Sequence, residues 1–132
     1  LYPVAFKDTS QSRWHEHYAA VTGFSSKQEY IDWCKIHRFG QMRKWASTAR
    51  PKLILCLGKQ YRADFKLAFH EESATFNHEF IDGRDLWWSL NAEGTLVVII
   101  PFMVNSHGLT RNDSIQVFGD RIARLMELHG CR

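Results

Sequence analysis

The side chains best suited to chemistry gather in one loop near the carboxyl end of the chain. This loop, from Pro101 to Asn112, carries amide, hydroxyl, imidazole and guanidinium groups on Asn105, Ser106, His107, Thr110, Arg111 and Asn112. An imidazole can donate a hydrogen bond to a carbonyl oxygen that gains negative charge as a glycosidic bond breaks. An amide can match a base edge with two hydrogen bonds, and a guanidinium can grip a phosphate. The loop is therefore the candidate site.

Three side chains of this loop have distinct expected roles. We predict that His107 is the catalytic residue, acting as an electrophile or as a base contact. Arg111 would contact a phosphate, and Asn105 would contact a base edge.

The same loop also has a purely structural interpretation. Thr110 or Asn112 could cap the helix that follows, with His107 merely exposed. Under the functional interpretation, Gly108 would instead let the backbone approach a nucleic-acid strand closely. The sequence leaves both interpretations open.

The segment before the loop is predicted to be a central strand. Its six residues, from Thr95 to Ile100, are apolar or β-branched and do not alternate. Both faces of such a strand are covered, as in a parallel α/β sheet. Ligands of these sheets bind in the crevice outside the carboxyl ends of the strands. An amphipathic helix over Asp113 to Leu128 would close the domain.

A second strand is predicted over Leu53 to Leu57, because this short apolar run is closed by Gly58. A helical pattern follows at once, so the segment is half of a βαβ unit. Thr75 to Ile81 partly alternates and could be an edge strand, followed by a turn at Asp82 and Gly83. Leu86 to Leu90 fits either a short strand or a helical turn.

A long helix is predicted before these strands. Ser25 and Ser26 can cap it, with Gln28 or Glu29 as the partner in a capping box, and the helix should run to about Thr48. Together these elements predict one α/β domain over residues 1–132. We expect a three-layer α/β/α sandwich with a short, mainly parallel sheet.

Charge is distributed unevenly along a chain whose net charge is only +3. From Trp33 to Ala63 there are eight basic residues and no acidic ones, whereas Asp64 to Glu93 holds seven acidic residues and two basic ones. A basic block of this kind can face a polyanion, or it can be the solvated surface of a helix. Both interpretations stay open.

Several other classes of function are not indicated. No apolar run approaches the ~20 residues of a membrane span, and no signal peptide is visible. Three widely spaced cysteines favour a reducing compartment, so we expect a cytoplasmic protein. The His/Cys pairs lack a doubled C-x2-C pattern, and we expect neither a metal nor another cofactor. The phosphate-loop frame G-x-x-x-x-G-K-[ST] is also absent.

Three segments together resemble one family. The stretch Pro51 to Gly58 (Pro-Lys-Leu-Ile-Leu-Cys-Leu-Gly) looks like the "Pro-Lys-Val-Ile-Val-x-x-Gly" strand of the uracil-DNA glycosylase superfamily. The start Leu1-Tyr2-Pro3, followed by a tryptophan and a long helix, is similar to the segment before that strand. The run from Val97 to Pro101 and its Ser/His/Gly/Arg loop resemble the C-terminal motif, which carries the family's active-site histidine.

The resemblance implies a four-stranded α/β/α sandwich that flips a damaged base and hydrolyses its N-glycosidic bond without a metal. In the family the histidine follows the strand's proline almost directly, whereas here Phe102 stands there and His107 lies five residues later. The family's first motif, with its water-positioning Asp or Asn, would lie before Leu1. The chain therefore resembles the C-terminal part of a longer domain of this kind.

These observations predict a DNA-binding, uracil-DNA-glycosylase-like domain that excises a base when the missing motif is present. The predicted DNA contacts are Asn105, Ser106, Arg111, Asn112 and Lys59. The basic block from Lys35 to Arg62 would assist electrostatically. Two alternatives remain open, namely a non-catalytic binding module or regulator domain on the same fold, and a small-molecule or nucleotide-processing α/β enzyme. The sequence does not indicate the oligomeric state.

Overall fold

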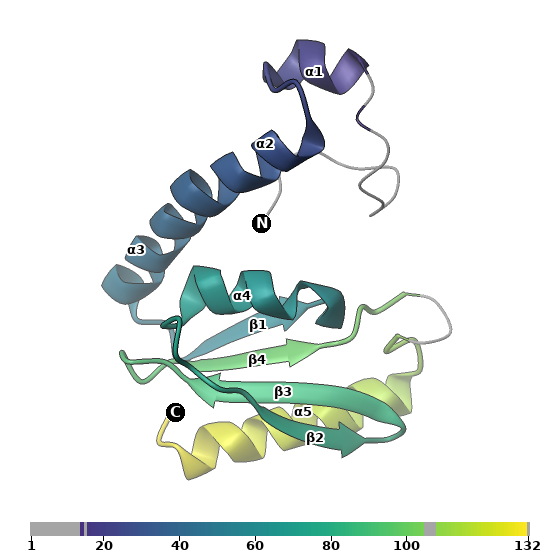
Figure 1. Ribbon diagram of the computed structural model, residues 1–132. Coiled ribbons are helices and arrows are strands. Elements are labelled where there is room, and N and C mark those ends of the chain that lie inside the picture. The colour runs from purple at the N-terminus through teal and green to yellow at the C-terminus, as the bar shows by residue number, and fades with distance from the viewer. Residues whose placement is uncertain (1–13, 15, 105–107, 132) are drawn as a thin grey trace.

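Helices and strands follow one another along the chain as Figure 1 shows. The computed structural model describes residues 14, 16–104 and 108–131. In order, the elements are α1 (Glu16–Thr22), α2 (Lys27–Trp33), the π-helical turn η1 (Cys34–Arg38), α3 (Phe39–Ala49), β1 (Leu53–Leu57), the 3-10 turn η2 (Lys59–Tyr61), α4 (Arg62–Phe69), β2 (Asn77–Ile81), β3 (Arg84–Leu90), β4 (Leu96–Ile100) and α5 (Asn112–Leu128).

The four strands form one mixed sheet in the order β1-β4-β3-β2. β1 and β4 are parallel, with Leu53 opposite Leu96, whereas β4/β3 and β3/β2 are antiparallel. The expectation of a mainly parallel sheet is therefore wrong. The reason is the turn at Asp82 and Gly83, where φ is positive at both residues (49° and 72°). Such a two-residue turn joins neighbouring strands as a hairpin.

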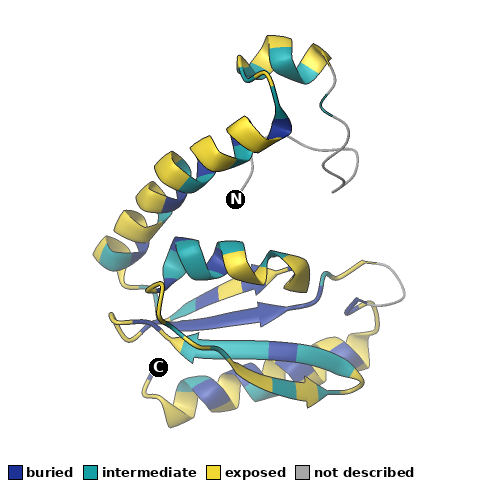
Figure 2. Ribbon diagram, in the orientation of Figure 1, coloured by how far each residue is buried: buried dark blue, intermediate teal, exposed yellow. Residues whose placement is uncertain are grey.

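Helices cover both faces of this sheet. α4 lies on one face, where Phe65 of α4 and Ala46 of α3 pack against alternate residues of β1 and β4. α5 lies on the other, where Phe118 and Leu125 pack against the opposite side of β4 and β3. Every residue of β4 is buried, which confirms the prediction of a central strand (Figure 2).

β1 is an edge strand rather than a doubly covered one. Ile54 and Cys56 are buried beneath the α4 layer, but Leu55 and Leu57 remain 44% and 40% exposed. The uninterrupted apolar run predicted the strand but not its position in the sheet.

The N-terminal helices form a rod that leads away from the sheet (Figure 1). α2, η1 and α3 run on from one another, and one wall of the rod is exposed along most of its length (Figure 2). Its start confirms the predicted cap, because Ser26 Oγ accepts from Glu29 N–H at 3.2 Å and Glu29 accepts from Ser25. The rod contacts α4 through the hydrogen bond that Arg43 donates to the Leu67 carbonyl.

α5 confirms the last predicted helix and starts one residue earlier than expected. Its buried residues, at Ser114, Phe118, Ile122 and Leu125, recur at intervals of three or four, as one helical face requires. Ile115 lies outside this face and is 39% exposed.

Within the described ranges, no helix combines the length and apolar character of a membrane span. The same ranges hold no group of three or more His, Cys, Asp or Glu side chains placed to bind a metal ion.

Candidate functional site

The predicted site residues fall into two sets. Asn105, Ser106 and His107 lie outside the described residues. Arg111 and Asn112 stand exposed where α5 begins, and Lys59 directly follows β1 and Gly58.

Arg111 is the N-cap residue of α5, but no side chain caps the helix. Its guanidinium donates to Asp113 Oδ2 at 2.7 Å, and both side chains are more than two-thirds exposed. The alternative prediction, a cap by Thr110 or Asn112, is therefore wrong. Arg111 remains open to solvent, as a phosphate contact would be.

The loop after β4 is closed tightly at its base. Leu109 N–H donates to the Phe102 carbonyl at 2.8 Å, and Arg84 Nε donates to the Gly108 carbonyl at 2.8 Å. A Cβ atom on Gly108 would lie 2.2 Å from the Phe102 carbonyl oxygen and 2.3 Å from that of Val104. Gly108 is thus needed for a close approach, but the chain that it approaches is its own.

The hairpin turn is tied to the start of α5. Ser114 Oγ donates to Asp82 Oδ2 at 2.5 Å, and Arg84 donates to the Asp82 carbonyl at 2.9 Å. The β2–β3 turn, the base of the loop and the first turn of α5 therefore hold one another in place.

An ionic cluster that the sequence analysis did not predict lies beside Lys59. The Asp85 carboxylate accepts from Lys59 Nζ at 2.8 Å through Oδ2, and it lies 2.9 Å from His78 Nε2 through Oδ1. The hydrogen bond from Lys59, followed by the contact with His78, holds the pKa of Asp85 below its ordinary value. The carboxylate is therefore ionised at neutral pH.

Trp87 adds an aromatic surface to this cluster. The His78 imidazole stacks on its ring, with centroids 4.9 Å apart and planes 15° apart. The Arg62 guanidinium lies over the same indole, 4.8 Å from its centroid. Trp87 is thus contacted by an imidazole and by a cation from the first turn of α4.

Strand register explains why these groups meet at the carboxyl ends of β1 and β4. Trp87 is opposite Ile99, so Asp85, two residues earlier on the same face of β3, lies level with the end of β4. His78 on β2 is opposite Trp87 on β3, and Lys59 follows the end of β1. This edge is where α/β sheets bind ligands.

Phe102 occupies part of the same edge. Its ring packs against Gly58, where a Cβ atom would lie 2.6 Å from Phe102 Cζ, and meets Tyr61 edge-on with centroids 6.3 Å apart. Gly58, with φ of 106°, is the residue that lets the chain turn beneath this ring. The family that the sequence resembles has its active-site histidine at this position, whereas this chain has a phenylalanine that packs against Gly58 and Tyr61.

Sequence reasoning missed Asp85, His78 and Trp87, and it placed Arg62 only in the basic block, not beside Trp87. The signal was the two-residue turn at Asp82 and Gly83, because it fixes the pairing of every residue in the hairpin. That pairing places His78 beside Trp87 and diagonal to Asp85.

A cysteine nucleophile is not part of this site. Burial raises the pKa of the Cys56 thiol to about 12, so the thiol stays protonated at neutral pH.

Comparison of the chain with protein-family models found no matching family, and comparisons with curated proteins and with solved structures found no match either.

Proposed function

We propose that this chain is a DNA-binding domain of the uracil-DNA-glycosylase type, built on a three-layer α/β/α frame, which holds the nucleic acid at the carboxyl ends of β1 and β4. The observation that carries the proposal is the cluster of Lys59, Arg62, His78 and Trp87 at that edge. Single strands and unstacked bases are bound by aromatic platforms flanked by cations, because every base has a flat face and every nucleotide a phosphate.

The half-exposed imidazole of His78 extends the stack from Trp87 toward solvent. In our proposal its outer face receives a base. Lys59 is 52% exposed despite its bond to Asp85, so a phosphate can approach the ammonium group from the solvent side. Arg62 and Arg111 supply further cations for the backbone, with Asn105, Ser106, His107 and Asn112 completing the contacts from the loop.

Binding is tested by fluorescence anisotropy of a labelled uracil-containing duplex and of its single strand. The affinity should fall steeply between about 50 and about 200 mM salt, because phosphate contacts release counterions. Replacing Lys59 or Arg62 with Ala should weaken binding and reduce the slope of log K against log salt by roughly one each. An absence of binding at the lowest salt would reject the proposal.

Two further variants sharpen this test. Arg124→Ala removes an exposed basic side chain on α5, on the face of the sheet opposite the cluster, and should leave binding nearly unchanged. Asp85→Asn removes the carboxylate that competes with phosphate for Lys59, so it should tighten binding. Weaker binding by Asp85→Asn would show that Lys59 does not contact DNA.

Excision of a base is a second candidate function, favoured by the pairing of an ionised carboxylate with an imidazole in Asp85 and His78. Such a pair can accept a proton from water. A strand-nicking assay on the uracil-containing duplex tests this activity. His107→Ala and Asp85→Asn should each reduce nicking sharply without unfolding the chain. Binding without nicking would instead support the alternative that the chain is a non-catalytic binding module.

A further inference from the structure

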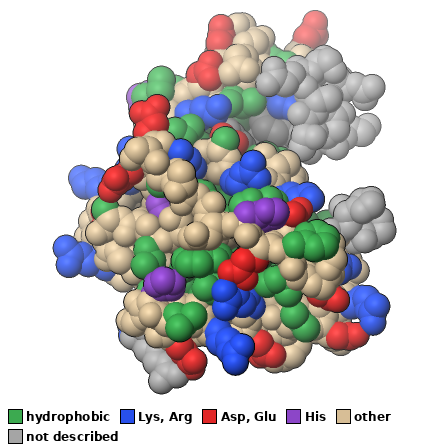
Figure 3. All heavy atoms as spheres, turned by 60° about the horizontal axis from the view of Figure 1, so that its bottom comes forward, with side chains coloured by type: hydrophobic (Ala, Val, Ile, Leu, Met, Phe, Trp, Pro, Cys, Tyr) green, Lys and Arg blue, Asp and Glu red, His purple; other side chains and the backbone are tan. Residues whose placement is uncertain are grey.

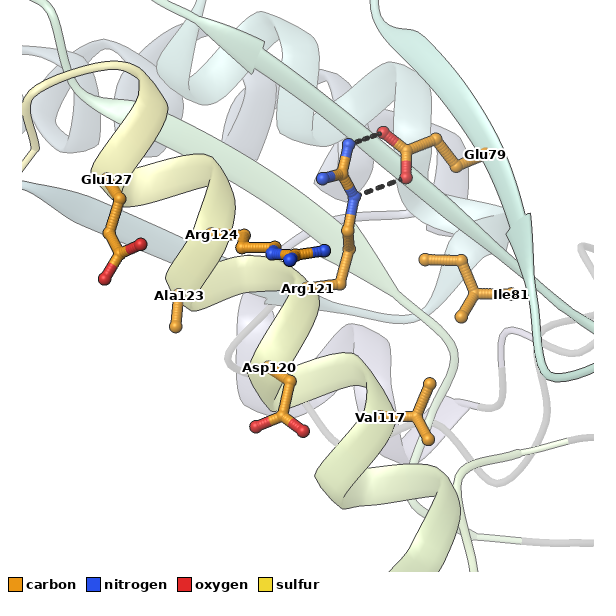
Figure 4. A pocket seen from close by; sticks show the side chains of 8 residues that line it. All are labelled: Glu79, Ile81, Val117, Asp120, Arg121, Ala123, Arg124 and Glu127. Atoms are coloured by element: carbon orange, nitrogen blue, oxygen red, sulfur yellow. Dashed lines mark hydrogen bonds and ion pairs between the residues drawn. The ribbon is translucent and has the colours of Figure 1, made fainter.

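A groove runs between β2 and α5, on the face of the sheet opposite the ionic cluster. Its volume is about 610 Å³, and its walls include Glu79 and Ile81 from β2 and Val117, Arg121, Arg124 and Glu127 from α5 (Figure 4). A second hollow of about 470 Å³ shares Arg121, Arg124 and Glu127 and extends to Leu128. The hollow surface therefore follows α5 along the outer side of the sheet.

The strand beside this groove has an open edge. β2 is last in the sheet order, and its hairpin turn makes Ile81 and Arg84 the first hydrogen-bonded pair. Hydrogen-bonded and non-hydrogen-bonded pairs alternate along an antiparallel ladder, so the backbone N–H and C=O groups of His78 and Phe80 point away from β3. No described residue forms a hydrogen bond with these outward groups. Phe80, at 70% exposed, leaves the edge accessible.

The usual protections of an edge strand are missing from β2. Its five residues contain neither Lys nor Pro, the residues that most often block pairing with another chain. Its one charged residue, Glu79, is turned into the groove and bound by Arg121. The edge itself carries no charge that would repel an added strand.

Three acidic side chains (Glu79, Asp120 and Glu127) and two basic ones (Arg121 and Arg124) line the groove. Arg121 is neutralised by two hydrogen bonds to Glu79, of 2.7 and 2.6 Å. Asp120 accepts from Gln116 Nε2 at 2.8 Å. Arg124 has no ionic partner in the described part of the chain, and its guanidinium lies beside the stem of Arg121 (Figure 4). The face around β2 and α5 otherwise mixes basic, acidic and hydrophobic side chains (Figure 3). Arg124 thus forms no ion pair with a described residue and lies next to an apolar wall of Ile81 and Val117, although the carboxylates of Asp120 and Glu127 also line the groove.

We propose that β2 binds an extended segment of a partner protein as an additional strand, and that an acidic side chain of this segment pairs with Arg124. The outward groups of His78 and Phe80 supply the backbone hydrogen bonds. Alternate side chains of the segment then enter the groove, with an apolar one against Ile81 and Val117. The lengths agree, because five residues of β2 span about 17 Å and α5 from Val117 to Leu128 spans about as much.

A defined probe tests this pairing. The probe is a fluorescein-labelled peptide that alternates valine and threonine and carries one central glutamate; its matched control has lysine in place of the glutamate. The acidic peptide should bind, and the lysine peptide should bind at least about threefold more weakly, as an exposed ion pair allows. Equal binding of the two peptides, or no binding of either, would overturn the proposal.

Two substitutions at one position separate backbone pairing from side-chain contact. Phe80→Ala removes the ring but keeps the outward N–H, whereas Phe80→Pro removes the N–H as well, which an edge strand tolerates. Phe80→Pro should bind the acidic peptide about tenfold more weakly than Phe80→Ala, the change expected for one lost hydrogen bond. Circular dichroism must show both variants folded. Equal affinities for the two folded variants would exclude an added strand.

A charge exchange checks the role of Arg124. Arg124→Glu should lose the preference for the acidic peptide and prefer the lysine peptide instead. An unchanged preference would place the acidic side chain elsewhere.

Sedimentation of the chain without peptide tests whether a second copy of the chain pairs with β2 instead of a partner protein. A dimer that disappears in Phe80→Pro, together with no peptide binding, would show that a second copy takes the edge.

Discussion

His78 Nε2 lies 2.9 Å from Asp85 Oδ1, across the diagonal of the β2–β3 hairpin. The contact exists because the two-residue turn sets His78 opposite Trp87, which places Asp85 on the same face two residues away. The carboxylate also accepts from Lys59, beyond the end of β1. One side chain of the hairpin thus bridges the edge strand β2 and the far edge of the sheet.

Replacing Asp85 with Asn should lower the free energy of unfolding at neutral pH by less than about 1 kcal/mol, since both partners are about half exposed. The pKa of Asp85 is lowered in the folded chain. Asp85 therefore contributes its full stabilisation at a pH above its ordinary pKa, and this stabilisation is lost as the pH falls through the pKa of the folded state. Urea titrations of the two proteins should therefore differ at neutral pH and converge in acid. A difference that grows in acid would contradict this assignment.

Glu79 and Arg121 should contribute more, because they form two hydrogen bonds and each is about 30% exposed or less. Trp88 Nε1 also donates to Glu79 at 2.8 Å. Glu79→Gln should lower the free energy of unfolding by about 1 to 2 kcal/mol. The hydrogen bond from Arg121 lowers the pKa of Glu79, so this contribution also disappears as the pH falls.

A double-mutant cycle with Arg121→Gln isolates the ion pair from the Trp88 contact. Chemical denaturation of the two single variants and of the double variant should give a coupling energy that is clearly favourable. Additive losses would mean that the pair contributes nothing beyond packing.

His70 should make the chain less stable below neutral pH. The side chain is only 5% exposed, its Nε2 atom has no hydrogen-bond partner among the described residues, and its ring packs edge-on against Phe76. Burial lowers the pKa of His70, so the unfolded chain takes up the proton first. Stability is then full above about pH 6.5, the ordinary value, and falls as the pH drops below it.

Urea titrations at about pH 7.5 and about pH 5.5 bracket the ordinary pKa of histidine and avoid most carboxyl groups. The original chain should lose stability between the two, and His70→Leu should lose less. His17→Leu, at an exposed position on α1, is the matched control and should behave like the original chain. The same loss in all three proteins would assign the effect to other groups.

Much of the framework follows from local patterns in the sequence. The run Thr95 to Ile100 predicted a covered central strand, and the Ser26 cap predicted the long helix, because each signal lies within a few neighbouring residues. The direction of the strands depended on a turn whose effect on pairing is not local. The partial alternation of Thr75 to Ile81 is compatible with an edge strand, but it does not show that this strand pairs with Leu86 to Leu90, and without that pairing the pattern predicts a mainly parallel sheet.

The candidate site was predictable only in part, for the same reason. Lys59 was identified from its place after the strand. Its partner Asp85 lies 26 residues away, and no spacing rule connects the two without the hairpin register. The helical pattern of α5 does not predict that Arg121 reaches Glu79 on β2, since long side chains at the border of a helical face can turn toward a neighbour. The three loop residues Asn105, Ser106 and His107 stay predictions.

Gly108 and Gly119 form a matched pair for testing the closure of the loop. A Cβ atom on Gly108 would meet two backbone carbonyl oxygens, of Phe102 and Val104, and backbone atoms cannot rotate away as a side chain can. Gly108→Ala should therefore lower the free energy of unfolding by about 1 to 3 kcal/mol. In Gly119, within α5, a Cβ atom would meet nothing within 4 Å. Gly119→Ala should raise stability by as much as about 1 kcal/mol, because alanine favours the helix. The midpoint temperature of thermal unfolding should thus fall for Gly108→Ala and rise for Gly119→Ala, although the chemical change is the same. If Gly108→Ala unfolds like the original chain, the loop does not close against its own carbonyl groups, and Gly108 is free to approach a ligand instead.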